Sequence, residues 1–172
     1  EDGPTHSGNY DLVYLRCIPN MIVMTPSDEN ETRKLLTTGF LHNGPASIRY
    51  PRGSGPNVIV ENDLSPVEIG KGRLIEEGSK DLIVINFGAL LDQAREVAST
   101  LGLTLIDMRF VKPLDEDILR KYLSDAQAFV SIEDGSVAGG AGSAVQEFCS
   151  KNNINVKSKL FGIPDIFIEH QS

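Results

Sequence analysis

Runs of apolar residues are short and widely spaced in the first third of the chain. Short apolar runs predict strands at residues 21–24 and 46–50, and a periodic stretch predicts a helix that begins after Ser27 or Asp28 and ends near Leu41. Either polar residue is a good helix N-cap. Two short strands and little more than one helix cannot close a layered domain. We therefore expect this front part to belong to a larger unit.

From residue 68 onward, apolar runs of strand length alternate with segments of helical period. The predicted strands cover residues 69–75, 81–87, 104–108, 128–132 and 156–161, and the predicted helices cover residues 90–101, a segment from about 115, and 140–150. Strands that are apolar throughout, such as residues 82–85, are typical of parallel sheets with helices on both faces. The pattern therefore predicts an α/β domain of about 100 residues.

The two parts are joined by a stretch of different composition. Residues 53–66 are rich in glycine, serine, proline and asparagine, with one weak apolar run at 58–60. Such composition is typical of a connection between domains. The chain also begins within a loop, and together with the incomplete front part this leads us to expect a piece of a larger protein.

Composition and charge narrow the range of functions. The 172 residues include 16 Lys and Arg against 24 Asp and Glu, for a net charge of −8, which disfavours nucleic acid as a partner. No apolar run approaches the roughly 20 residues that span a bilayer, so we expect no membrane association. Cys17 and Cys149 lie far apart and lack metal-type spacing. This favours a reducing, cytoplasmic compartment over a disulfide-stabilised fold.

Three polar residues form the first candidate site. Asp2 and His6 lie in a loop rich in glycine and proline, and Arg52 follows the end of a predicted strand. Loops that follow parallel strands lie on the ligand side of such sheets. Together the three side chains could hold a hydroxyl, transfer a proton and bind a phosphate. Residue chemistry alone leaves open that they are ordinary polar loop residues.

A glycine-rich turn at residues 135–142 forms the second candidate, because it follows a strand and precedes a helix. That setting suits a phosphate-binding loop. However, the spacing does not match G-x-G-x-x-G and no Lys-Ser/Thr pair follows. We therefore favour tight packing of strand against helix. Glu133 and Asp134 are adjacent, and we interpret them as a polar loop or an interface contact rather than a catalytic carboxylate pair.

The remaining candidates carry weaker signals. His42 and His170 have no Cys, His or acidic partners at metal-ligand spacing, which favours surface histidines. Tyr10 and Tyr50 could stack on a ligand, but aromatic packing at the ends of helices and strands explains them equally well. None of the four adds a site of its own.

Several sequence blocks together indicate a family. Residues 1–6, Glu-Asp-Gly-Pro-Thr-His, resemble the loop shared by transketolase-like thiamine diphosphate enzymes. Further blocks resemble the 1-deoxy-D-xylulose-5-phosphate synthases within that family; they cover residues 8–16, 18–21, 25–30, 49–53, 108–115, 139–143, 162–165 and 167–170. The blocks occur in the family order along the whole chain, so the resemblance is far more specific than any single block.

The resemblance implies a fold and a reaction. Residues 1–56 would be the end of a pyrimidine-binding domain, residues 57–67 a linker, and residues 68–172 a transketolase-type C-terminal domain with a parallel or mixed sheet and flanking helices. The family consists of homodimeric enzymes that join pyruvate to D-glyceraldehyde 3-phosphate with loss of CO2. This is the entry step of the methylerythritol phosphate route to isoprenoids, and it also feeds thiamine and pyridoxal synthesis.

The resemblance also implies roles for the first candidate site. Asp2 matches the aspartate that contacts the sugar-phosphate substrate. His6 matches the catalytic histidine that faces the reacting carbon of the cofactor and contacts substrate. Arg52, in Tyr-Pro-Arg-Gly, matches the arginine that binds the acceptor phosphate.

The cofactors are thiamine diphosphate and Mg²⁺, but the Gly-Asp-Gly…Asn motif that holds them is absent from this sequence. The upstream glutamate that activates the cofactor is absent as well. We therefore expect both cofactors to be bound mainly by an N-terminal portion outside this chain, assign neither cofactor-binding residues nor metal ligands here, and expect the chain alone to be inactive.

Two alternatives remain open. One is a fragment of transketolase or of a two-oxo-acid dehydrogenase β subunit, which share this pair of domains; the blocks at residues 49–53 and 108–113 speak against it. The other is a non-catalytic module for dimerisation or ligand sensing. Retention of Asp2, His6 and Arg52 together speaks against loss of catalysis.

Overall fold

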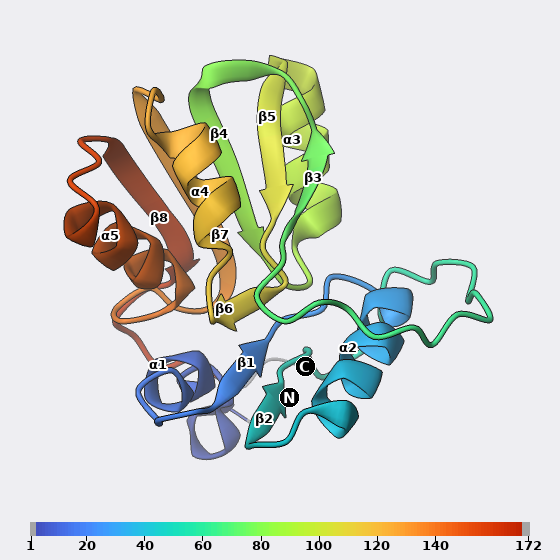
Figure 1. The fold of residues 1–172 in the computed structure, drawn as a ribbon. Coiled ribbons are helices and arrows are strands. Elements are labelled where there is room, and N and C mark those ends of the chain that lie inside the picture. Colours follow the sequence, from blue (N-terminus) through green and yellow to red (C-terminus); the bar gives the residue numbers. More distant parts are fainter. Residues whose placement is uncertain (1–2, 170–172) are drawn as a thin grey trace.

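A computed structural model describes residues 3–169, which form two sheets of unequal size (Figure 1). The larger sheet has the strand order β3-β5-β4-β7-β8, in which β3 is antiparallel to β5 and the other neighbours are parallel. Its strands are β3 (Arg73–Glu76), β4 (Ser79–Phe87), β5 (Leu103–Asp107), β7 (Ala128–Ser136) and β8 (Lys157–Ile163). The sheet is therefore mixed, with one antiparallel edge strand.

Helices cover both faces of this sheet, as the continuous apolar strands predicted. They are α3 (Leu91–Leu101), α4 (Glu116–Leu123) and α5 (Ala141–Lys151). Figure 1 shows α3 on one face and α4 with α5 on the other. Ile83 and Ile85 of β4 pack into the core beneath α4 and α5, whereas Val84 packs beneath α3. Alternate residues of one strand thus stabilise both layers, since successive strand side chains point to opposite faces.

The smaller sheet contains strands from both parts of the chain. Its order is β2-β1-β6, with β1 parallel to β2 and antiparallel to β6. The front elements are η1 (Gly3–His6), α1 (Asp11–Leu15), β1 (Ile22–Met24), α2 (Glu29–Leu41) and β2 (Ala46–Ile48). Strand β6 (Phe110–Lys112) comes from the rear part, and its Phe110 packs against Ile22, Met24 and Leu35. The hydrophobic pattern did not predict β6, because only Phe110 and Val111 form an apolar run there, between Arg109 and Lys112.

Most predicted elements match, and the differences have local causes. Helix α2 is capped by Asp28, whose side chain accepts a hydrogen bond from Glu31 N, and α3 ends at Gly102 in the left-handed region. Strand β3 starts at Arg73, later than predicted, because the chain turns at Gly70 with φ of 75°. Strand β7 continues to Ser136, beyond the predicted end at residue 132.

The stretch that connects the two parts lies along α2 and is fastened to it by side-chain hydrogen bonds. Asn30 Nδ2 donates to Ile59 O at 3.0 Å, and Asn30 Oδ1 accepts from Glu61 N at 3.0 Å. Further along, Thr38 Oγ1 accepts from Val67 N at 2.7 Å. The segment is irregular in backbone, yet its path is fixed by one polar face of the helix.

A buried ionic cluster also joins the front part to the larger sheet. Glu31 of α2, only 3% exposed, accepts hydrogen bonds from Arg109 at 2.6 and 2.9 Å and from Arg73 at 3.1 Å. Arg73 Nε also donates to Asp107 Oδ2 at 3.1 Å, and Arg73 Nη2 donates to Ser27 Oγ at 2.9 Å. Buried charges that pair this completely fix the orientation of the two parts.

Across residues 3–169, none of the helices is both long and apolar enough to span a membrane.

Candidate active-site pocket

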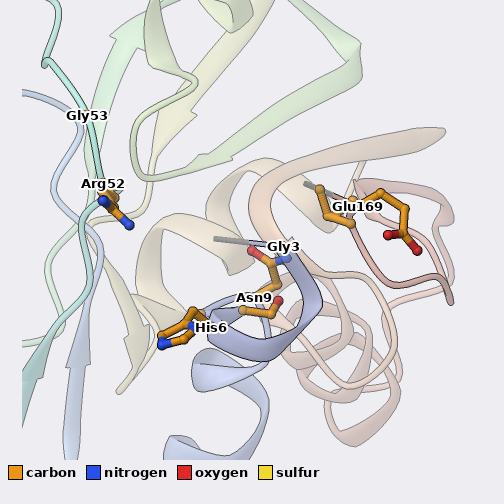
Figure 2. Close-up of a pocket in the computed structure, with 9 residues that line it drawn as sticks. Gly3, His6, Asn9, Arg52, Gly53 and Glu169 are labelled. Carbon is orange, nitrogen blue, oxygen red and sulfur yellow. The ribbon is translucent and has the colours of Figure 1, made fainter. Parts of the chain in front are cut away.

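The opening loop, the stretch after β2 and the C-terminal segment enclose a pocket of about 560 Å³. Figure 2 draws the lining residues as sticks, and they come from all three segments. Its lining consists of Gly3, His6, Ser7, Gly8, Asn9, Arg52, Gly53, Ile168 and Glu169. The fold therefore brings together His6 and Arg52, which are far apart in sequence. Asp2, the third predicted residue, lies outside the described residues.

His6 is presented by a single turn of 3₁₀ helix. It is the last residue of η1, whose first residue, Gly3, has φ of 60°, a conformation that favours glycine. The His6 side chain is exposed, and its Nδ1 lies 3.0 Å from Thr5 Oγ1. If the threonine hydroxyl donates to Nδ1, the neutral ring carries its proton on Nε2. Such a ring can donate a hydrogen bond to a ligand in the pocket.

Arg52 is presented by the extended stretch that continues β2. The strand direction persists beyond Ile48, because Arg49 N donates to Met24 O of β1 at 2.8 Å. Pro51 then restricts the backbone just before Arg52. In Figure 2 the guanidinium end of Arg52 is directed into the pocket, from the wall next to His6. A guanidinium in this place suits a phosphate or carboxylate ligand.

The Tyr-Pro-Arg-Gly motif is preceded by a second arginine with a different environment. The side chain of Arg49 is only 12% exposed and does not line the pocket. Its Nη1 donates to Asp134 Oδ2 at 2.9 Å, and its Nε lies 3.4 Å from Asp11 Oδ2. This ion pair confirms that Asp134 makes an interface contact, in this case between β7 and the front part.

The glycine-rich turn is filled by a carboxylate of the chain itself. Glu133 accepts hydrogen bonds from Ala141 N at 2.8 Å and from Gly142 N at 2.9 Å, at the start of α5. Burial raises the pKa of Glu133, although these two N–H groups partly offset the effect. A side chain at Gly140 would collide with Ser136 O and the Glu133 carboxylate. The turn is therefore tightly packed, as predicted, and these two N–H groups are not a phosphate site.

Among the described residues, the other sequence candidates do not line the pocket. His42 follows α2 as its C-cap, and Tyr10 is partly exposed near α1. Tyr50 lines a separate cavity of about 280 Å³ beside the start of α2, so its role as a stacking or packing residue stays open. His170 lies outside the described residues. Within residues 3–169, no three His, Cys, Asp or Glu side chains cluster closely enough to hold a metal ion.

The sequence did not predict the pocket's far wall. Ile168 and Glu169 reach it from the opposite end of the chain, and Ser7 and Asn9 complete the loop side. Residues 167–170 stood out as a block of the family pattern, but nothing in that block shows that it returns to the opening loop. That proximity depends on the whole intervening fold.

The pair of domains is the one found in transketolases. A family model described as "Transketolase, C-terminal domain" matches residues 70–172, and another described as "Transketolase, pyrimidine binding domain" matches residues 1–57. The first match covers more than half of the chain.

Curated relatives cover nearly the whole chain. The 1-deoxy-D-xylulose-5-phosphate synthase of Pseudomonas fluorescens strain SBW25 is 54% identical over 99% of this chain and 27% of that protein. The synthase of Pseudomonas syringae pv. tomato is 56% identical with the same coverage, and that of Pseudomonas aeruginosa strain LESB58 is 54% identical. The chain thus spans 27% of the length of the curated relatives it matches.

A solved structure supports the same assignment. It is described as a split gene transketolase in an inactive beta4 tetramer, and it superposes with a TM-score of 0.85 at 31% identity. The match covers 95% of this chain and 55% of that one. The chain therefore belongs to the transketolase family, and its relatives there include the 1-deoxy-D-xylulose-5-phosphate synthases.

Proposed function

We propose that this chain supplies the substrate-facing wall of the active site of a 1-deoxy-D-xylulose-5-phosphate synthase. The enzyme would join pyruvate to D-glyceraldehyde 3-phosphate and release CO2. The observation that carries the proposal is that His6 and Arg52, from separate segments, line one pocket in a chain 54–56% identical to such synthases.

Arg52 binds the phosphate of the acceptor in this proposal. A phosphate dianion gains most from a guanidinium, which offers several charged N–H donors in one plane. Its place in the lining of the same pocket as His6 supports this role. Asp2, assigned by resemblance alone, would contact the sugar part of the same substrate.

His6 delivers a proton to the substrate. When the new carbon–carbon bond forms at the aldehyde carbon of the acceptor, the aldehyde oxygen becomes a hydroxyl and takes up a proton. A protonated His6 ring can donate it and is then left as a neutral imidazole, while Thr5 Oγ1, 3.0 Å from Nδ1, orients the ring. Thiamine diphosphate, when bound, makes the pyruvate-derived carbon nucleophilic.

The family implies dependence on thiamine diphosphate, while Mg²⁺ and the assembly belong to the proposal. Residues 3–169 offer no cluster of metal ligands, so they do not fit a Mg²⁺–diphosphate site. We propose that an N-terminal portion of the enzyme binds both groups, that the enzyme is a cytoplasmic homodimer, and that its product feeds isoprenoid, thiamine and pyridoxal synthesis. The inactive state of the split-gene transketolase tetramer is consistent with inactivity of this part alone.

The reaction can be tested by isotope labelling of the full-length enzyme with both cofactors present. Pyruvate labelled at C2 should give 1-deoxy-D-xylulose 5-phosphate labelled at C2, while label at C1 should leave as CO2. Xylulose 5-phosphate should not replace pyruvate as the two-carbon donor. Efficient transfer from that ketose, without CO2 release, would contradict the proposal and indicate a transketolase.

A further inference from the structure

Arg49 lies where three segments of the chain meet. It belongs to the stretch after β2, and its backbone N–H donates to Met24 O of β1 at 2.8 Å. Its side chain, 12% exposed, reaches Asp134 near the end of β7 and Asp11 at the start of α1. One guanidinium thus connects the strand that leads to Arg52, the helix that follows the His6 loop, and the larger sheet.

The link to the His6 side is short. Asp11 is the first residue of α1, and its Oδ1 accepts from Leu12 N at 2.9 Å, while the Leu12 side chain is fully buried. A second contact runs in parallel, because Ser136 N of β7 donates to Asn9 O at 2.9 Å. The loop that carries His6 is therefore anchored to β7 at Asn9, the last residue of the loop that lines the pocket, and again through Asp11.

The link to Arg52 is equally short. Only Tyr50 and Pro51 separate the two arginines, and proline restricts the backbone between them. A shift of Arg49 is therefore transmitted to Arg52. Without the guanidinium, Asp11 and Asp134 would be left as neighbouring carboxylates in a half-buried place. Their repulsion and incomplete hydration would separate α1 from β7.

We infer that Arg49 is a positioning residue that holds the His6 loop and the Arg52 stretch in register with β7, and so sets the width of the substrate pocket. This inference rests on the proposed function, because it acts through the two residues to which that function assigns substrate contacts. Arg49 itself contacts no substrate.

The test uses the full-length enzyme with cofactors present and compares Arg49→Ala, Arg49→Lys and the control Arg16→Ala. Arg16 has a similar exposure of 16% and also joins the front part to the rear, through Gly139 O and Glu147, but it does not line the pocket. We expect Arg49→Ala to raise the KM for D-glyceraldehyde 3-phosphate by about 10- to 100-fold, with a much smaller change for pyruvate. Arg49→Lys should restore part of this loss, because a lysine can pair with one carboxylate.

The Arg16→Ala variant should lose stability, but it should not raise the KM for D-glyceraldehyde 3-phosphate more than the KM for pyruvate. If Arg49→Ala folds poorly, Arg49→Lys keeps the test decisive, since its melting temperature and its KM values can be compared at full folding. Equal changes for both substrates, or changes that follow the melting temperature in Arg49 and Arg16 variants alike, would overturn the inference.

A double-mutant comparison separates this inference from the proposed function. In an Arg52→Ala background, Arg49→Ala should raise the acceptor KM by less than about threefold, because it acts through Arg52. Titration with inorganic phosphate should show the same loss of affinity without any turnover. If Arg52→Ala leaves the KM for D-glyceraldehyde 3-phosphate unchanged, the proposed function is wrong. If Arg52→Ala raises that KM but Arg49→Ala does not, the proposed function stands and the positioning role of Arg49 is wrong.

Discussion

Glu31 and Arg109 form a bidentate ion pair in which a carboxylate of α2 receives two hydrogen bonds, at 2.6 and 2.9 Å, from an arginine that follows β5. Arg109 has a positive φ of 58°, which is uncommon for a residue other than glycine. Because Arg73 also donates to Glu31, the carboxylate sits between two guanidinium groups. The pair fixes α2, and with it the stretch that leads to the pocket, against the larger sheet.

Removal of the Glu31 carboxylate should therefore be costly. Glu31→Ala removes the carboxylate that pairs with Arg109 and one of the two carboxylates that accept from Arg73, in a largely buried place, and we expect the free energy of unfolding to fall by about 3–5 kcal/mol. Urea denaturation followed by circular dichroism measures the change. The exposed pair of Asp92 with Arg95 serves as control, and Asp92→Ala should alter stability by less than about 0.5 kcal/mol. Similar losses in both variants would contradict a special role for Glu31.

The sequence predicted those elements whose signals are local. The start of α2 after Ser27 or Asp28, the end of α3 near residue 101 and the apolar strands each depend on a few adjacent residues. In contrast, β6 and the Arg49–Asp134 pair depend on which segments meet in space. Neither leaves a periodic or spaced signature in the sequence.

The residues of the candidate pocket also differ in whether the sequence could predict them. His6 and Arg52 could be selected because their residue types suit the chemistry and because both lie in blocks of the family pattern. Ile168 and Glu169 could not be placed at the same pocket, since no local pattern reports a contact between opposite ends of a chain. In the glycine-rich turn, the local sequence suggested a possible phosphate-binding loop, but the N–H groups of Ala141 and Gly142 donate to Glu133 instead.

The buried Glu133 should leave a signature in the pH dependence of stability. Burial raises its pKa in the folded protein above the ordinary value of 4.5, so the folded state binds the proton more tightly than the unfolded chain. Its contribution to stability is therefore fully present below about pH 4.5 and is lost as the pH rises through the folded pKa. Relative to wild type, Glu133→Gln should become progressively more stable as the pH increases from 4 to 7.

Urea denaturation at several pH values measures this difference. Asp117 is a useful control because its exposed carboxyl pairs with Lys71 at 2.8 Å, which lowers its pKa. Asp117→Asn should show a constant disadvantage from pH 7 to pH 4, which is lost only when the pH falls below about 3.8, the ordinary pKa of an aspartate. A Glu133→Gln difference that stays constant from pH 4 to 7 would argue against a raised pKa.

The chain alone should not bind the cofactor with measurable affinity. Residues 3–169 contain no cluster of metal ligands that could hold Mg²⁺ against a diphosphate. Isothermal titration of the isolated chain with thiamine diphosphate and Mg²⁺ should therefore give no binding heat, and addition of the N-terminal portion should restore it. Micromolar, Mg²⁺-dependent binding by the chain alone would refute this prediction.

Arg52→Ala should affect the two substrates unequally. Loss of a charge-assisted contact to the acceptor phosphate should cost on the order of 2–4 kcal/mol of transition-state binding, which is roughly 30- to 1,000-fold in kcat/KM for D-glyceraldehyde 3-phosphate. The KM for pyruvate should change little, because pyruvate carries no phosphate. Steady-state kinetics with each substrate varied in turn measures both. Arg120, an exposed arginine of α4, provides the control, and Arg120→Ala should leave both values unchanged. Equal losses for both substrates would point to a structural role for Arg52.

His6→Ala tests the proposed chemistry most directly, because it separates turnover from stability. The His6 side chain is exposed, and the hydrogen bond we describe for it joins its ring to the adjacent Thr5. Its removal should therefore shift the melting temperature only slightly. Turnover should nonetheless fall by about 10²- to 10⁴-fold, the range typical of a positioned proton donor.

The paired experiment measures steady-state kinetics and thermal melting of His6→Ala and Thr5→Val in the full-length enzyme with both cofactors present. Thr5→Val keeps the imidazole but removes the hydroxyl beside Nδ1, so it should lower turnover by a smaller factor than His6→Ala. If His6 only packs its loop, activity and stability would fall together. Near-normal turnover of His6→Ala would exclude His6 from the chemistry, and the proton for the aldehyde oxygen would then have to come from another group.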